Sequence, residues 1–140
     1  MDKTQIVGLI DALLSPGNEE RKRAEDAFHS MLSSNPQFCV QTLMTVVSSP
    51  ADFTDTQRQL AGIQLRIALV NPSETVWDKL SEEMQKAVKQ HLLVLLETEN
   101  SATSNVVRRA IDGAVSGLAT FLLSDLPPSA RGSGKVFVLI

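Results

Sequence analysis

The chain has 140 residues and a net charge of −3, with 43% apolar and 21% charged residues. These values are typical of one soluble domain that is long enough to bury a core. They exclude a basic field that would attract phosphate backbones. With 4% aromatic residues and no tyrosine, a surface on which bases stack is also disfavoured, so we expect no nucleic-acid partner.

The single cysteine and the first residues of the chain suggest the cellular compartment of the protein. Cys39 is the single cysteine, which rules out an internal disulfide and is typical of a reducing environment. The start, 1–4, lacks the basic region and apolar stretch of a signal peptide. The longest apolar runs, 92–96 and 136–140, are far shorter than the roughly twenty residues of a membrane span. We expect a protein of the cytoplasm and nucleus with no membrane partner.

Apolar residues recur at helical spacing along most of the chain and predict six helices in three pairs. The first helix runs from about Thr4 to Leu14 and stops at 15–17. The second begins with Asn18 as its N-cap. Asn35 and Pro36 start the third as cap and first-turn residue, and 48–50 ends it.

The fourth helix is the most informative segment. It is entered through Asp52 or Thr54 and closed by Asn71-Pro72. Small Ala61 and Gly62 in its middle allow a very close neighbour, which is typical of one layer in a stacked helical array.

A loop holding Trp77 follows, and Ser81 is expected to cap the fifth helix. A polar turn spans 100–104. The sixth helix runs from about Asn105 to Leu123, and its inward face is predicted to consist of Val107, Ala110, Ile111, Ala114, Val115 and Leu118.

The second helices of the three pairs begin near Asn18, Asp55 and Ser104, at spacings that bracket the forty-odd residues of HEAT-type repeats. Such pairs stack because they cannot bury their apolar faces alone. We therefore predict an all-α fold, a right-handed α-solenoid of about three HEAT-like helical hairpins over 1–125, with an irregular tail over 126–140. The tail has a linker composition and then an apolar end, and we interpret it as a truncated, alternative or artificial terminus.

A phosphate-binding loop is a poor fit to Gly132-Ser133-Gly134-Lys135. Ser129 stands where the motif needs its first glycine, and Val136 follows the lysine where the motif needs Ser or Thr. We interpret this segment as linker.

Other chemistry is equally poorly supported. His29 and His91 lie on different predicted helices without further ligands at metal-binding spacing, and Cys39 is expected to be a small core residue. The glycines of 113–117 favour close helix packing. We predict no enzyme, no catalytic residue, no metal site and no cofactor.

Polar stripes remain on the second helix of each pair. They consist of Lys22, Asp26 and His29, of Arg58, Gly62 and Arg66, and of Arg109, Asp112 and Ser116. Two interpretations stay open: a solvated face, as for most such stripes, or one partner-binding surface on the concave side of an arch.

Several motifs in order resemble the N-terminal domain of the importin-beta (karyopherin-beta) superfamily. They are Arg21-Lys22-Arg23-Ala24-Glu25-Asp26-Ala27-Phe28, Asn35-Pro36-Gln37-Phe38, Arg58-Gln59-Leu60-Ala61 through Leu65-Arg66, and Trp77. The resemblance covers about Ile6 to Asp125, and 80–122 looks closest to the importin branch that carries ribosomal proteins and histones. Arg66-Ile67 departs from the family's frequent Lys-Asn, and the chain has three repeats where members have about twenty.

The resemblance implies an N-terminal fragment of a nuclear transport receptor that binds the GTP-bound form of the small GTPase Ran for nuclear protein import. It implies that second-helix residues make this contact, and it nominates Arg58, Arg66 and Arg109, with Glu25 as a structural partner. Protein cargo and nucleoporins would bind further along a full-length receptor, and Ran itself would hold the GTP. The alternative is a generic HEAT-repeat scaffold or adaptor without Ran binding.

Overall fold

A computed structural model describes residues 3–70, 76–98 and 104–124, and within these ranges the chain is all-helical and contains no strand. The all-α prediction is confirmed. The described helices are α1 (Lys3–Leu13), α2 (Asn18–Ser34), α3 (Pro36–Val47), α4 (Asp55–Val70), α5 (Val76–Lys79), α6 (Glu82–Thr98) and α7 (Asn105–Ser124). The single-turn α5 lies where the sequence predicted only a loop.

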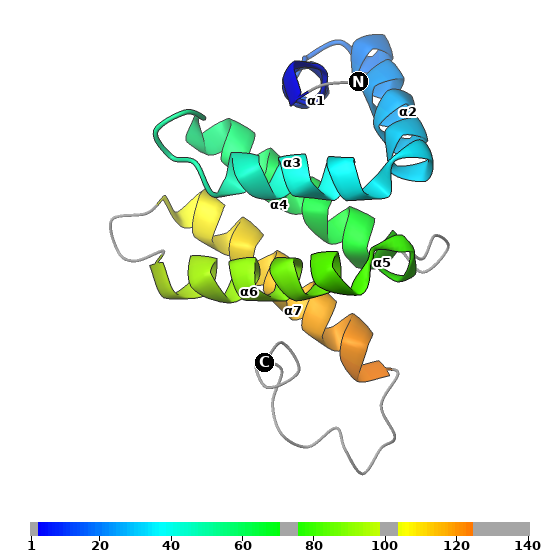
Figure 1. The fold of residues 1–140 in the computed structure, drawn as a ribbon. Coiled ribbons are helices and arrows are strands. Elements are labelled where there is room, and N and C mark those ends of the chain that lie inside the picture. Colours follow the sequence, from blue (N-terminus) through cyan, green and yellow to red (C-terminus); the bar gives the residue numbers. More distant parts are fainter. Residues whose placement is uncertain (1–2, 71–75, 99–103, 125–140) are drawn as a thin grey trace.

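The long helices pack as three consecutive pairs: α1 with α2, α3 with α4, and α6 with α7 (Figure 1). In the view of Figure 1, α3 and α6 lie in front, and α4 and α7 lie behind them. Helix α4 is central because it packs extensively against both α3 and α7. The second helices of the second and third pairs are therefore direct neighbours.

Three helix starts, those of α3, α4 and α6, have side-chain caps at predicted positions. The Asn35 side chain accepts a hydrogen bond from the backbone N–H of Phe38 at 3.4 Å, with Pro36 in the first turn. The Ser81 hydroxyl accepts one from the N–H of Met84 at 3.1 Å. Each cap satisfies an N–H that has no partner inside its helix.

Helix α4 begins with a reciprocal capping box. Of the two predicted entry residues, Thr54 provides the cap: its hydroxyl accepts a hydrogen bond from the Gln57 N–H at 3.1 Å. The Gln57 side chain in turn accepts from the Thr54 N–H at 3.0 Å. Gln57 also donates to the Asp11 carboxylate at 2.9 Å, which ties the start of α4 to α1.

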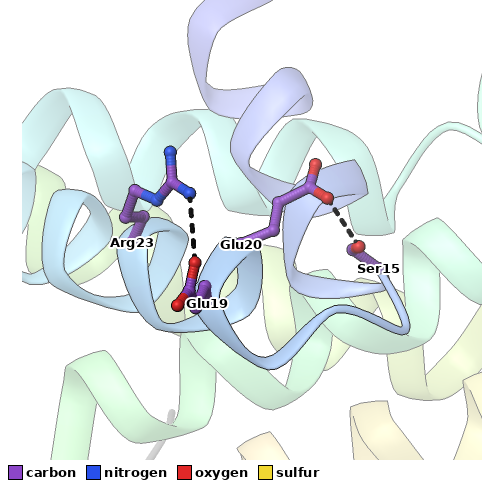
Figure 2. A network of polar contacts seen from close by, with 4 residues as sticks. All are labelled: Ser15, Glu19, Glu20 and Arg23. Atoms are coloured by element: carbon purple, nitrogen blue, oxygen red, sulfur yellow. Dashed lines mark hydrogen bonds and ion pairs between the residues drawn. The ribbon is translucent and has the colours of Figure 1, made fainter.

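The start of α2 differs from the prediction that Asn18 is its N-cap. Gly17 occupies the cap position without a side-chain hydrogen bond, and Asn18 is the first helical residue. The Ser15 hydroxyl instead donates to the Glu20 carboxylate at 2.7 Å, beside an exposed Glu19–Arg23 ion pair (Figure 2). Ser15 also accepts from the Gly17 N–H, so these contacts order the turn that precedes α2, but they do not replace the bond that a cap side chain makes to a first-turn N–H.

The core runs continuously through all three pairs. The predicted inward face of α7 is confirmed, because all six of its residues are buried. Cys39 is a buried core residue, as expected. The predicted helix end at Asn71-Pro72, most of the 100–104 turn, and the 126–140 tail with its Gly132–Lys135 segment lie outside the described residues.

Trp77 anchors the connection between the second and third pairs. Its side chain is buried in α5, and its carbonyl accepts a hydrogen bond from the Gln85 side chain at 2.8 Å. The Lys89 ammonium lies 6.0 Å from the centre of the indole ring, within cation–π range. These contacts fix α5 against α6.

Candidate partner-binding surface

The structure places the three nominated arginines in different environments. Arg58 is only 3% exposed, and its Nε donates a hydrogen bond to the Val47 carbonyl at 2.9 Å. Val47 ends α3, where backbone carbonyls lack helical partners and the helix dipole is negative. A cation in the first turns of α4 therefore stabilises the end of α3. Arg58 joins the two helices of one pair and presents almost no surface to a partner.

The next member of the same stripe, Gly62, faces α7. A Cβ atom added to Gly62 would lie 2.9 Å from the Ala110 Cβ. This distance is shorter than carbon atoms tolerate. The close neighbour predicted from small residues in the fourth helix is therefore confirmed, and it is α7.

Arg66, two turns after Arg58, is exposed and lies across two glycines of α7. An added Cβ at Gly117 would lie 3.2 Å from Arg66 Cγ and 3.3 Å from its Nε. An added Cβ at Gly113 would lie 3.8 Å from Arg66 Nη1. The close packing expected of these glycines is made with an arginine stem, which leaves the Arg66 side chain supported along the surface of α7.

Arg109 is also exposed and lies on α7 one turn before Gly113. One turn of helix advances about 5–6 Å along the axis, so Arg109 and Arg66 belong to the same α4–α7 surface. Within the described part of the chain, neither side chain takes part in an ion pair or a hydrogen bond. Asp112, from the same predicted stripe as Arg109, is likewise exposed.

A groove of about 250 Å³ lies between α2 and α4. Its floor contains buried Phe28 and Leu32, and Ile67 stands exposed on the α4 side. Glu25 lies on the α2 side and is exposed. The sequence did not predict this groove; the signal that could have suggested it is the i, i+4 spacing of Ile63 and Ile67, two large apolar residues that the structure leaves exposed.

A second groove of about 250 Å³ lies between α3 and α6, the helices in front in Figure 1. Its lining contains no lysine or arginine and consists of Gln41, Met44, Thr45, Met84, Ala87, Val88 and His91. The α2–α4 groove is likewise lined by no lysine or arginine, and the two linings differ in charge only by the acidic Glu25 of α2.

Reactive chemistry finds little support in the described ranges. Burial raises the pKa of the Cys39 thiol to about 12, so the thiol stays protonated near neutral pH and is a poor nucleophile. No group of three or more His, Cys, Asp or Glu residues there could hold a metal ion. None of the helices described is both long enough and apolar enough to cross a bilayer.

A scan against protein-family models gives no match for this chain, and no solved structure matches it. The fold is all-helical over the described residues, and it buries Arg58 while leaving two arginines, Arg66 and Arg109, exposed on the α4–α7 surface.

Proposed function

We propose that the chain is the N-terminal fragment of a nuclear transport receptor that binds Ran in its GTP-bound form for nuclear protein import. The observation that carries the proposal is the α4–α7 surface, on which Arg66 and Arg109 are exposed and take part in no ion pair among the described residues. The proposal also rests on the resemblance to the importin-beta superfamily. It places the protein in the cytoplasm and nucleus and gives it no catalytic role.

The proposed architecture is a right-handed α-solenoid of HEAT-like hairpins. Its support is that contacts join each helical pair to the next, α2 to α3 and, more extensively, α4 to α7. Repeat arrays have this nearest-neighbour character, and their second helices line one continuous surface. Cargo and nucleoporins would bind repeats beyond these three.

The three arginines take different roles in this proposal. Arg66 and Arg109 contact acidic groups of Ran, since both are exposed cations on one surface. Arg58 acts indirectly, because its hydrogen bond to Val47 fixes α4 against α3. Exposed charge pairs each contribute little affinity but strongly affect partner choice and association rate.

Retention of Ran on the immobilised full chain tests the proposal, with Ran locked in its GTP form and Ran–GDP compared. We expect GTP-dependent retention, and we expect Arg66→Glu combined with Arg109→Glu to weaken it about tenfold or more. A matched control is Lys79→Glu combined with Lys86→Glu, which changes the net charge equally at exposed positions of α5 and α6.

Circular dichroism confirms that both double variants are folded, and an established Ran-binding receptor serves as the positive control. Absence of GTP-dependent retention would refute the Ran proposal. Equal loss in both double variants would show that the total charge, and not the α4–α7 surface, governs binding.

The second candidate is a HEAT-repeat scaffold or adaptor that does not bind Ran. The groove between α2 and α4 favours it, because a largely apolar groove suits many protein ligands and is not specific to a GTPase. Nucleotide-independent binding of a partner to this surface is the result expected of a scaffold.

A further inference from the structure

We propose that the α2–α4 groove binds an arginine side chain of a partner protein, with the aliphatic stem on the apolar floor and the guanidinium at the carboxylate of Glu25. The inference goes beyond the proposed function, because neither Arg66 nor Arg109 lines this groove and its test needs no Ran. It names the chemistry of one contact that a partner would make between the first and second helical pairs.

The floor of the groove is apolar and has room for one long side chain. It is lined by four buried residues, Phe28, Leu32, Ala68 and Val76, and Ile67 stands exposed on the α4 side. A cavity of about 150 Å³ is enough to bind benzene, and this groove offers about 250 Å³. An arginine buries its methylene groups along apolar surface while its charge stays in water, so its stem matches such a floor.

Among the residues that the structure describes, Glu25 is the only charged one that lines the groove. It is exposed and takes part in no ion pair within the described ranges. Of the two cations one turn before it on α2, Arg21 donates a hydrogen bond to the Asn18 side chain, and Lys22 forms no ion pair with it. Arg66 of α4 lies across α7 and is absent from the lining. The Glu25 carboxylate can therefore accept a cation from a partner.

The polar groups of the two walls favour arginine over lysine. Glu25 lies on the α2 wall, and half-buried Gln64 lies on the α4 wall. A guanidinium carries five N–H donors in one plane and is more weakly hydrated than an ammonium. It can donate two parallel hydrogen bonds to the Glu25 carboxylate and still has donors for the Gln64 amide oxygen.

The α3–α6 groove provides an internal comparison. Its volume is also about 250 Å³, but no acidic residue lines it. If volume and apolar surface alone governed binding, an arginine side chain would enter both grooves equally. Charge complementarity assigns it to the α2–α4 groove. Because salt screens exposed charges beyond about 8 Å, the nearby carboxylate matters more than the net charge of the chain.

Four short peptides, identical except at one central residue among glycines and serines, test the inference by NMR titration of the isotope-labelled full chain. The central residue is arginine, lysine, citrulline (the neutral isostere of arginine) or glutamate. One side chain binds weakly, so we expect a Kd of about 1 mM for the arginine peptide. Affinity should fall in the order given, with citrulline about fivefold weaker than arginine at low salt. Amide shifts should centre on α2 and α4 around the groove and leave Thr45 and Ala87 of the α3–α6 groove unchanged.

Three variants at exposed positions separate charge from shape. Glu25→Gln should remove the preference for arginine over citrulline, and Glu25→Lys should make the glutamate peptide bind more tightly than the arginine peptide. Asp26→Asn is the matched control, because it makes the same change of charge at an exposed residue outside the lining, and it should leave the preference intact. Ile67→Ala shortens the apolar wall and should weaken the arginine and citrulline peptides by a similar factor.

Equal binding of the arginine and citrulline peptides would overturn the inference, as would equal effects of Glu25→Gln and Asp26→Asn or no shifts at about 10 mM peptide. Equal binding of the lysine peptide would overturn the choice of arginine. Shifts at the groove that depend on the concentration of the chain alone would assign it to a second copy and overturn the inference. Peptide binding without Ran retention would refute only the Ran proposal, and Ran retention without peptide binding would refute only the groove assignment.

Discussion

Gly62 is the point where α4 and α7 approach most closely among the glycine positions described, and replacing it by alanine probes that interface. The new Cβ would lie 2.9 Å from the Ala110 Cβ and 3.5 Å from the Ala110 carbonyl carbon. Non-bonded carbon atoms pack best at about 3.5–4.0 Å. Neither atom belongs to a flexible side chain, so α4 and α7 must separate by roughly 0.6–1 Å.

Two opposing terms set the magnitude. Overpacking a well-packed interface typically costs about 1–3 kcal/mol, and replacing a mid-helix glycine by alanine returns roughly 0.5–1 kcal/mol. We therefore expect Gly62→Ala to lower the free energy of unfolding by about 1–2 kcal/mol. Gly113→Ala is the matched control on the facing helix, since the nearest atom to its added Cβ is the end of the Arg66 side chain at 3.8 Å. It should raise stability by about 0.5–1 kcal/mol.

Urea unfolding monitored by circular dichroism measures both changes. Small proteins lose roughly 1–3 kcal/mol per molar urea, so the two variants should differ in midpoint by about 1 M. Adding Ala110→Gly to Gly62→Ala removes the clashing atom and should recover part of the loss, although glycine weakens α7. If Gly62→Ala is as stable as the unmodified chain, or the added Ala110→Gly only lowers stability further, the close approach of Gly62 to Ala110 does not limit which residue position 62 accepts.

Arg58→Met keeps the aliphatic stem but leaves the Val47 carbonyl without its donor, so the free energy of unfolding should fall by about 2–3 kcal/mol. The same change at exposed Arg66, Arg66→Met, should alter it by less than about 0.5 kcal/mol. Equal effects of the two variants in urea unfolding would contradict the structural role of Arg58 as the donor to Val47. Thr54→Ala breaks the capping box of α4 and should cost about 1 kcal/mol in the same measurement. Unfolded Cys39 ionises near its ordinary pKa of 9.0, but the folded thiol has a pKa of about 12, so the unfolded chain binds fewer protons above pH 9. Stability that is intact below pH 9 should then decline by up to about 1.4 kcal/mol per pH unit between pH 9 and 12, and Cys39→Ala should lack this component; parallel pH profiles for the two proteins would rule it out.

The helices and most of their starts could be predicted because they depend on local chemistry. Asn35 and Ser81 cap their helices through backbone N–H groups three residues ahead, and this spacing is visible in the sequence. The cap prediction for Asn18 was wrong because the helix begins one residue earlier: Gly17 takes the cap position, and the side-chain oxygen of Asn18 accepts a hydrogen bond from the Arg21 guanidinium. Both residues are good caps by type, so only the geometry of the turn separates them.

The site was less predictable because it depends on which helices meet. Helical periodicity groups Arg58, Gly62 and Arg66 on one stripe, but it does not show that α3 ends beside the first residue and that α7 covers the second. The groove between α2 and α4 was missed for the same reason. Its floor residues, Phe28 and Leu32, have the pattern of ordinary core positions.

The stripe on α4 therefore changes its function along its length. At Arg58 the cation satisfies a carbonyl inside a helical pair, at Gly62 the missing side chain allows two pairs to touch, and at Arg66 the cation lies across the junction of those pairs. The position of the exposed charge thus depends on the packing beneath it. A variant that separates α4 from α7 should move Arg66 relative to Arg109 and weaken partner binding even when both arginines are present. Binding losses at Gly62 are informative about the surface only when they exceed the measured loss of folded protein.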